Sequence, residues 1–394
     1  MARDWAAVVG QWLSAADELG LGDRLHRVLR GEARVGDVYE LLRAPLWLVG
    51  GAARAVTDRI TGRRVGYIVN MIMNYTNVCV VGCRFCSFYR RAGDPDAYRF
   101  SARRAAEMVR EHWERYRIRQ VLFQGGVDPR LGLEYYEEAF RLIKRLTRGE
   151  VAIHGLSVVE LEWLSRRERM SIGELLERLK AAGLDSVPGA GAEILSDRVR
   201  RIVSPRKSSA DTWLWVMGRV MEAGLPISVT MMYGHVETLW ERAVHLLRLL
   251  ELQRRYGRVM AFIAWNYEPG GNDLSRDVPF PAGGGEMLRT IAVARLVFRD
   301  EIRWIQAGWL TAGPALGAAS LEYGANDWGG TLYGERVLPA AGVPLPLLVR
   351  RGIERLIRGA GFEPFERDNW YRPVERGGEG VAEERGAAGA AAVA

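Results

Sequence analysis

The chain has 394 residues, 48% of them hydrophobic and 26% charged, so it can bury a sizeable core as one large domain or as two to three ordinary ones. Its cysteines are too few for a disulfide framework. It has no run of about eighteen uncharged apolar residues, which argues against a membrane span. We also find no signal peptide, so we expect a cytoplasmic protein. The net charge of +7 comes from basic residues spread beside acidic ones, without a nucleic-acid motif, so we expect no nucleic-acid partner and interpret the charge as a solvated surface or as attraction of a small anionic substrate.

Residues 1–60 are predicted to be helical, because apolar residues recur at three- and four-residue spacing. The pattern then changes to short β-branched or aromatic runs that alternate with long amphipathic segments. The runs lie at 64–71, 118–124, 151–156, 184–189, 226–234, 259–267 and 302–309, with a weaker one around 323–330. Several of the segments between them open on Ser or Thr and close on Gly, as helices do.

Strand–helix units repeated about eight times predict a parallel sheet closed as a (β/α)8 TIM-type barrel over residues 61–335. A doubly wound open sheet is the alternative, because periodicity cannot distinguish an open sheet from a closed one. We expect residues 1–60 to form a helical extension and residues 336–375 a helical segment packed on the barrel. Residues 376–394 lack aromatic anchors, which predicts a disordered tail.

Unusual residues cluster just past the carboxyl ends of the predicted strands. In chain order they are the three cysteines, Gln124 to Gly126, His154 and Ser157, Gly189 to Glu193, Gly234 to Glu237, and Trp265 to Glu268. In a barrel these loops share one face, and that face carries the active site.

Cys79, Cys83 and Cys86 form one C-x3-C-x2-C run and are the only cysteines of the chain. A structural zinc site needs four ligands, usually in two separated pairs, and the histidines nearest in sequence lack that spacing. An iron–sulfur cluster is normally held by four thiolates, so three would leave one iron open to bind something else. The spacing favours a catalytic cluster over zinc or coincidence.

Written with its neighbours as CVVGCRFC, the run resembles the signature of the radical S-adenosylmethionine (SAM) enzymes. The resemblance implies that the three thiolates hold a [4Fe-4S] cluster whose fourth iron chelates the methionine moiety of SAM. Reductive cleavage then yields a 5′-deoxyadenosyl radical, which requires a reductant such as ferredoxin or flavodoxin.

The same resemblance implies further site residues. Gln124, Gly125 and Gly126 stand where the superfamily contacts the methionine amino group, and TMMYGHVE at 230–237 is similar to its adenine-binding pattern. The cofactor contacts implied in this way are Phe85, Phe88, Gln124, Gly125, Gly126, Ser157, Glu193, Thr230, Met232 and Gly234.

Within the superfamily, NYTNVC at 74–79, LDSVPGAGAEILSDRVRRIVSP at 184–205 and YGANDWGGTL at 323–332 resemble the cyclic dehypoxanthine futalosine synthases of menaquinone biosynthesis. Aminofutalosine synthase, the deazaflavin (FO) synthase components and methylornithine synthase are similar in several of these blocks. Trp265 and Trp309 favour the cyclase.

This resemblance implies a substrate, dehypoxanthine futalosine, that loses its ribose C4′ hydrogen and closes a ring onto its own aromatic group. The reaction needs a near-attack geometry, exclusion of water and a base. His154, Glu237 and Glu268 are our catalytic candidates, although a lone histidine at a strand end is more often a structural hydrogen-bond partner.

Three departures from the family pattern bear on the substrate. Met71 and Ile72 replace an Arg-Asn pair of the family, and Ala190 replaces a glycine. Glu268 stands in a stretch that is proline-rich in the family. An arginine is thus lost and a carboxylate gained near the expected mouth. Aminofutalosine synthase or FO synthase-like activity therefore stays open, and a zinc-stabilised, non-catalytic barrel is the remote alternative.

Overall fold

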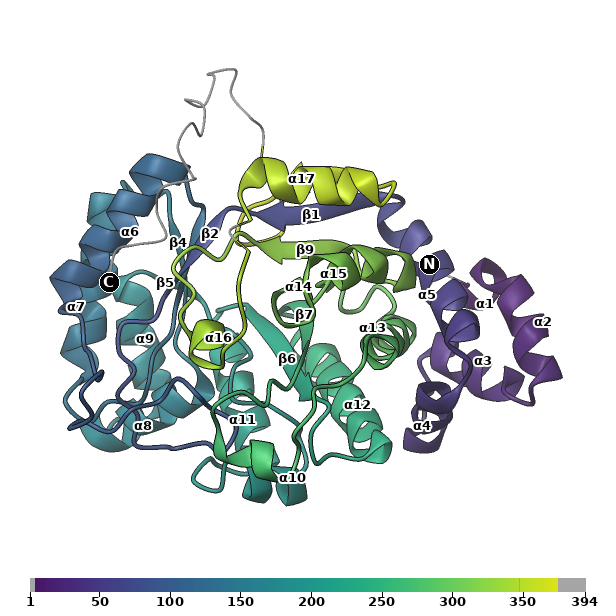
Figure 1. The fold of residues 1–394 in the computed structure, drawn as a ribbon, viewed down its shortest axis with the longest axis horizontal. Coiled ribbons are helices and arrows are strands. Elements are labelled where there is room, and N and C mark those ends of the chain that lie inside the picture. Colours follow the sequence, from purple (N-terminus) through teal and green to yellow (C-terminus); the bar gives the residue numbers. More distant parts are fainter. Residues whose placement is uncertain (1–3, 347, 375–394) are drawn as a thin grey trace.

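The computed structural model describes residues 4–346 and 348–374 and is built around a ring of parallel strands (Figure 1). The strands are β1 (Arg64–Ile68), β2 (Asn70–Met73), β3 (Gln120–Phe123), β4 (Ala152–Gly155), β5 (Leu184–Ser186), β6 (Ile227–Tyr233), β7 (Val259–Asn266), β8 (Trp304–Ile305), β9 (Asp327–Gly330) and β10 (Glu363–Glu366).

The ring closes on itself. The strands pair in the orders β2-β3-β4-β5 and β6-β7-β8, and a bridge between Val187 and Ile227 joins the two sets. A second bridge, from Gln306 to Asp327, connects β8 to β9, and β9 pairs with β1. A third bridge, from Met71 to Tyr333, joins β2 to the chain just after β9. This closure confirms the predicted (β/α)8 barrel and excludes the doubly wound open sheet.

Most of the helices that follow the strands cover the outside of the ring (Figure 1). The helical elements of the barrel are α6 (Ala102–Tyr116), α7 (Leu133–Leu146), α8 (Val158–Glu168), α9 (Ile172–Ala182), α10 (Asp197–Val203), α11 (Ala210–Glu222), α12 (Leu239–Tyr256), η1 (Asp273–Arg276), α13 (Gly284–Phe298), α14 (Trp309–Ala312), α15 (Pro314–Ser320) and η2 (Leu321–Tyr323). The short helix α14 instead borders the barrel interior. Side-chain caps fix several starts: Ser171 opens α9 and Thr238 opens α12, each in a capping box with the glutamate three residues on.

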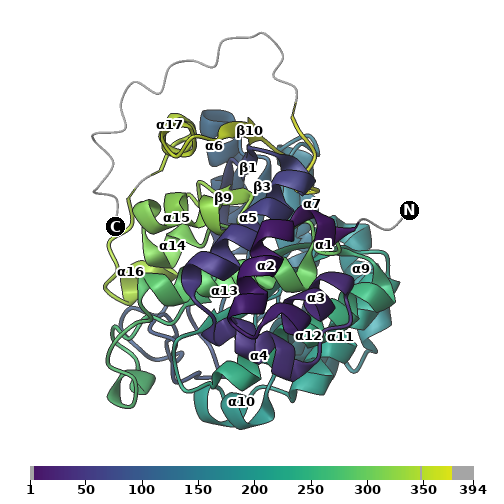
Figure 2. The ribbon, with the colours of Figure 1, turned by 90° about the vertical axis from the view of Figure 1, so that its right-hand side faces the viewer.

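Five helices precede the barrel: α1 (Trp5–Val8), α2 (Gly10–Glu18), α3 (Gly22–Arg30), α4 (Val35–Arg43) and α5 (Leu46–Thr61). They lie together on one side of the ring (Figure 2), where α5 packs against α13 and α4 against α12. The N-terminal helices therefore thicken the outer layer of the barrel wall.

The first predicted strand, 64–71, is divided at Val69 into β1 and β2. The cause is β10, which pairs with β1 and takes the place that β3 has beside β2. We did not predict β10. Its Pro364 disfavours a strand interior but is tolerated here, since β10 is the edge of its sheet. The predicted helical segment 336–375 thus contains a strand as well as α16 (Val337–Ala340) and α17 (Arg350–Gly359), while residues 375–394 lie outside the described residues.

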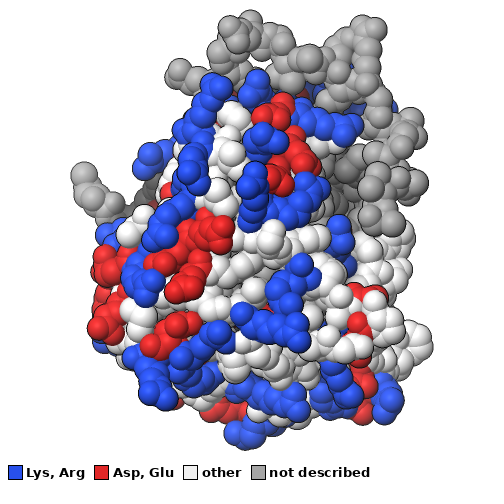
Figure 3. Space-filling view, turned by 90° about the vertical axis from the view of Figure 1, so that its left-hand side faces the viewer, with Lys and Arg blue, Asp and Glu red and all other residues white. Residues whose placement is uncertain are grey.

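Charged side chains of both signs are mixed on the face that carries α6 and α7 (Figure 3). On α6, for example, Arg103 pairs with Glu107 at 3.0 Å and Arg104 with Glu111 at 2.8 Å. Within the described ranges, no helix is both long and apolar enough to cross a membrane.

Candidate active site

A cavity of about 380 Å³ occupies the inside of the barrel. At one end it is lined by all three cysteines, and at the other by Arg367, Asn369 and Tyr371, which follow β10. Between them it is walled by the strands and by the loops at their carboxyl ends. This is where a (β/α)8 enzyme carries its active site.

The cysteine loop is shaped by its own backbone contacts. The Cys79 N–H donates to Arg90 O at 3.0 Å, and the Cys86 N–H donates to Cys83 O at 3.1 Å. Gly82 has a φ of +58°, the left-handed turn that glycine adopts without cost. None of the three cysteines forms a disulfide, so the loop presents three free thiols to one end of the cavity.

Cys83 is buried, and Cys79 and Cys86 are half-buried, next to a lysine that we did not predict. Burial raises the pKa of Cys83 to about 12, and the ammonium group of Lys207 opposes this rise. Lys207 also forms an ion pair with Glu193. A cation at this place favours the thiolate form that metal ligands must adopt. The sequence feature that could have pointed to this residue is its rarity, since Lys207 is one of only three lysines in the chain.

The number of thiols suits a cluster better than a single zinc ion, because a structural zinc site is completed by four protein ligands. Three free thiols, with no fourth in the chain, fit a [4Fe-4S] cluster with one open iron.

Gly126 packs directly behind this loop, and its replacement by alanine is expected to displace the loop. A Cβ on Gly126 would lie 2.2 Å from Val78 O and 3.0 Å from the Cβ of Cys79, so the backbone must move at a cost of about 1–3 kcal/mol. We expect a lower iron content after anaerobic reconstitution, measured per chain. Gly93→Ala is the matched control, because a Cβ there meets nothing within 4 Å; an unchanged iron content in Gly126→Ala would contradict the prediction.

Most of the predicted cofactor contacts line the cavity. Those that do are Phe85, Phe88, Gln124, Gly125, Ser157, Glu193, Thr230 and Met232. Gly126 and Gly234 are not among the lining residues: Gly126 backs the cysteine loop, and Gly234 follows β6 with a φ of +82°.

Glu193, in the loop after β5, contacts both β6 and Lys207. Its O accepts a hydrogen bond from the Met232 N–H at 3.0 Å, and its carboxylate pairs with Lys207, whose Nζ lies 5.2 Å from the ring centre of Phe85. The φ of Glu193 is +44°, in the left-handed region that non-glycine residues adopt uncommonly.

A second buried carboxylate, Glu160, was missed by sequence reasoning. It accepts a hydrogen bond from Tyr75 Oη at 2.6 Å, and Tyr75 Oη lies 2.9 Å from Tyr136 Oη. Glu160 lines the cavity beside Gly125, and burial raises its pKa to about 7. In sequence it reads only as an acidic residue in the first turn of α8, three residues after the cap Ser157.

The raised pKa of Glu160 has a predictable effect on stability. An ordinary carboxyl has lost its proton above about pH 4.5, whereas folded Glu160 keeps its proton up to about pH 7. The contribution of Glu160 to stability is therefore fully present below the unfolded pKa. As the pH rises to 7, the free energy of unfolding falls by on the order of 3 kcal/mol. Denaturation at a series of pH values should show this fall in the wild type and not in Glu160→Gln. Glu177→Gln, an exposed carboxylate on α9, should leave the fall in place; parallel curves for wild type and Glu160→Gln would contradict the prediction.

His154 lines the cavity from β4. Its Nδ1 lies 2.7 Å from Ser186 Oγ and its Nε2 lies 3.2 Å from Ser228 Oγ. Burial and the nearby Arg367 lower its pKa to about 3, so the ring is neutral at physiological pH. Its catalytic assignment stays a prediction.

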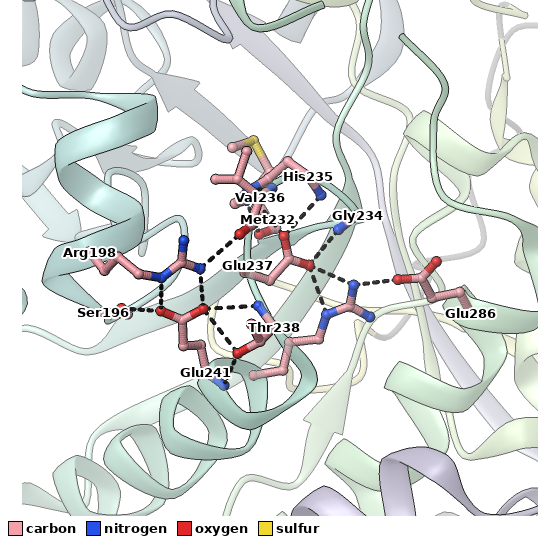
Figure 4. Close-up of polar contacts among 11 residues, drawn as sticks. Ser196, Arg198, Met232, Gly234, His235, Val236, Glu237, Thr238, Glu241 and Glu286 are labelled. Carbon is pink, nitrogen blue, oxygen red and sulfur yellow. Dashed lines mark hydrogen bonds and ion pairs between the residues drawn. The ribbon is translucent and has the colours of Figure 1, made fainter. Parts of the chain in front are cut away.

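Glu237 and Glu268 are not brought into the cavity, because neither is among its lining residues. Glu237 accepts hydrogen bonds from the backbone N–H groups of Gly234 (2.7 Å) and His235 (2.9 Å) (Figure 4). It also pairs with Arg242 at 2.5 Å. These contacts hold the loop after β6. Glu268 accepts from Asn266 Nδ2 at 2.5 Å and is half-buried.

Two of the residues that depart from the family pattern differ in their positions. Met71 is buried in the core, while Ile72 lines the cavity. Trp265 and Trp309, which favoured the cyclase in sequence, both line the cavity as well.

Comparison with known proteins agrees with this site. Residues 73–249 match the radical SAM superfamily, and residues 256–378 match the CofH/MqnC C-terminal region. The fold and the thiol site thus define a radical SAM enzyme, which uses a [4Fe-4S] cluster and S-adenosylmethionine.

Named relatives cover most of the chain. It is 40% identical to the cyclic dehypoxanthine futalosine synthase of Streptomyces coelicolor (83% of this chain, 82% of the relative) and 37% identical to the aminodeoxyfutalosine synthase of Thermus thermophilus (82% and 87%). It is 36% identical to the 5-amino-6-(D-ribitylamino)uracil–L-tyrosine 4-hydroxyphenyl transferase 1 of Methanosarcina acetivorans (90% and 94%). The chain belongs to the futalosine, MqnC and CofH family of radical SAM enzymes.

Solved structures show the same fold at low identity. Methylornithine synthase (PylB) matches with a TM-score of 0.65 at 18% identity, over 86% of this chain and 97% of that one. The FeFe-hydrogenase maturase HydG from Carboxydothermus hydrogenoformans matches with a TM-score of 0.69 at 16% identity, over 94% and 87%. Together these comparisons confirm the family, the barrel and the cofactors predicted from the sequence.

Proposed function

We propose that this enzyme converts dehypoxanthine futalosine to cyclic dehypoxanthine futalosine in menaquinone biosynthesis. The observation that carries the proposal is that Trp265 and Trp309, the residues that favour the cyclase in sequence, line the same cavity as the three cysteines. The 40% identity to a relative of that name supports it. Ferredoxin or flavodoxin is the reductant that we expect.

When bound, the cluster and SAM supply a 5′-deoxyadenosyl radical, which is able to take a hydrogen atom from an unactivated carbon. Cys79, Cys83 and Cys86 would hold the cluster, and the predicted cofactor contacts at the strand ends would hold SAM beside it. Trp265 and Trp309 would press the aromatic part of the substrate toward its own ribose. Holding two reacting parts of one molecule together is what an intramolecular ring closure needs most.

Water exclusion comes from the walls of the cavity. Val81, Val127 and Val159 line it near the cysteines, and Met232 and Ile263 line it from β6 and β7. Such a lining protects a reactive carbon from side reactions. His154 enters this proposal as a neutral hydrogen-bonding group, because a histidine with a pKa of about 3 is a weak base at physiological pH.

The alternatives are the reactions of the other two relatives, and the departures from the family pattern that line the cavity, Ile72 and Ala190, keep them in the test. The reconstituted enzyme is incubated anaerobically with SAM and reductant in three arms. One arm contains dehypoxanthine futalosine, one contains 5-amino-6-(D-ribitylamino)uracil with L-tyrosine, and one contains the substrate of aminodeoxyfutalosine synthase.

Mass spectrometry should find a product in the first arm alone, with the mass of the cyclised compound. A product in either other arm, or 5′-deoxyadenosine without a cyclised product, would overturn the proposed function.

A further inference from the structure

A layer of polar side chains crosses the barrel interior at the end of the cavity away from the cysteines. We call it the polar floor; it consists of Asn70, Gln120, His154, Ser186, Ser228 and Asn369, all of them buried. Barrel interiors are normally filled by branched apolar side chains. Buried polar groups cost stability unless each is hydrogen-bonded, so a whole layer of them needs a reason other than packing.

One half of the polar floor is a chain of amides. Asn70 and Gln120 are the first residues of β2 and β3, and Asn70 Nδ2 donates to Gln120 Oε1 at 3.0 Å. Gln120 Nε2 in turn donates to Asn369 Oδ1 at 2.7 Å. Each amide group carries two N–H donors, and these bonds use one donor of Asn70 and one of Gln120. The side-chain amides of Asn70 and Gln120 therefore each keep one N–H that these bonds do not use.

The other half is a chain of hydroxyl groups around His154. Asn369 Nδ2 donates to Ser186 Oγ at 3.1 Å, and Ser186 Oγ lies 2.7 Å from His154 Nδ1. His154 Nε2 lies 3.2 Å from Ser228 Oγ, which also accepts from the Gly189 N–H at 3.3 Å. Asn369 thus joins β3 to β5, the two strands on either side of β4, which carries His154.

Asn369 reaches this place because the chain turns back into the barrel after β10. Arg367 pairs with Asp327, and the Tyr371 ring lies 5.6 Å from that of Trp304 in a stacked arrangement. Gln306 Nε2 donates to Tyr371 Oη at 3.1 Å. The C-terminal segment is therefore held at several points and forms part of the cavity wall.

The polar floor is open to the cavity and carries no net charge. All its members except Ser186 line the cavity, and His154 is neutral. The nearby guanidinium of Arg367 is engaged by Asp327 at 2.5 and 2.9 Å. A buried carboxylate or phosphate needs a free cation, which this surface does not offer. Neutral amides and hydroxyls match the hydroxyl groups of a ligand.

We propose that the polar floor is the subsite for an uncharged part of the substrate that carries several hydroxyl groups, a sugar or sugar-alcohol chain. This inference rests on the proposed function, in which that part is the hydroxyl-bearing edge of the ribose of dehypoxanthine futalosine, with the ribose C4′ turned toward the cysteine end. The C-terminal segment then determines specificity through Asn369, although it lies far in sequence from every cofactor contact.

The test measures binding without turnover. Reconstituted enzyme with SAM but no reductant is titrated, by tryptophan fluorescence, with dehypoxanthine futalosine and with its 2′,3′-dideoxy analogue. A second pair is 5-amino-6-(D-ribitylamino)uracil and the analogue whose ribityl chain is replaced by pentyl. Two or more hydrogen bonds lost from a desolvated site weaken binding about tenfold or more, so the ratio of the two Kd values in a pair should be at least about ten.

Ser228→Ala and Asn369→Ala should bring this ratio close to one while the affinity for the deoxygenated analogue changes little. Thr57→Val is the matched control, because it removes a buried hydroxyl, bonded to Ala53 O and Gly324 O, that does not line the cavity. Its ratio should equal that of the wild type. SAM binding by each variant reports whether the barrel is intact, and one intact floor variant is sufficient for the test.

A ratio that persists in an intact floor variant, or an equal loss of affinity for both members of a pair, would overturn the proposal. If only the ribityl pair binds, and its ratio depends on Ser228 and Asn369, the proposed cyclase function fails while the sugar-binding floor stands. If the futalosine pair binds with a ratio near one in the wild type, the floor proposal fails and the cyclase function is unaffected.

Discussion

Replacing any one of Cys79, Cys83 and Cys86 by serine is expected to abolish the iron–sulfur cluster and, with it, all turnover. Each thiolate must hold a different iron, and the chain has no further cysteine to take over. In the described ranges, no set of His, Asp or Glu side chains is arranged to substitute as a metal site. A serine hydroxyl stays protonated at neutral pH and is a poor ligand for iron.

The measurement is the iron and sulfide content per chain after anaerobic reconstitution, together with 5′-deoxyadenosine formation in the presence of reductant. Val80→Ser is the matched control, since Val80 lies between Cys79 and Cys83 but its side chain is 40% exposed. It should reconstitute like the wild type. A cysteine variant that retains a full complement of iron and cleaves SAM would show that the thiols are not the ligands.

The cysteine site could be predicted from the sequence because its information is local. Three thiols within eight residues can reach one cluster whatever the rest of the fold does, and Gly82 fixes the turn between them. The barrel could be predicted for a related reason, since each strand–helix unit carries its own hydrophobic period. The strand ends then bring distant loops to one face.

The far end of the cavity could not be predicted in this way. Asn369 enters the barrel only because β10 pairs with β1, and β10 has no strand pattern of its own. Lys207 meets Glu193 through the path of the loops around α10, which periodicity does not describe. Glu160 is distinguished from other first-turn acids only by its burial beside Tyr75. Each of these placements depends on tertiary contacts.

The ion pair between Arg367 and Asp327 is expected to dominate the stability of this far end. Arg367 Nε and Nη2 lie 2.5 and 2.9 Å from the two carboxylate oxygens, and the guanidinium lies 3.6 Å from the ring centre of Tyr371. The side chains are only 2% and 0% exposed. The pair joins the segment after β10 to β9, next to the point where the barrel closes.

Arg367→Met should therefore lower the free energy of unfolding by about 3–5 kcal/mol, because it leaves the Asp327 carboxylate buried without its cation. Burial already raises the pKa of Asp327, and Arg367 opposes that rise, so the variant should bind a proton at Asp327 more readily. A group whose pKa is raised on folding stabilises the folded protein at low pH, and this stabilisation is lost as the pH rises through the folded pKa. The loss should thus be larger at pH 8 than at pH 5, as measured by chemical denaturation under anaerobic conditions.

The double variant Arg367→Met/Asp327→Leu separates the charge from the packing. It removes both ions, so it should be more stable than Arg367→Met alone, and its loss relative to wild type should not grow with pH. Arg104→Met is the control for removing an arginine from an exposed pair on α6, and it should cost no more than about 1 kcal/mol. If Arg367→Met costs as little as Arg104→Met, the pair does not secure the barrel closure. If the double variant is no better than Arg367→Met, the loss comes from the packing of the arginine stem on Tyr371 and not from the stranded carboxylate.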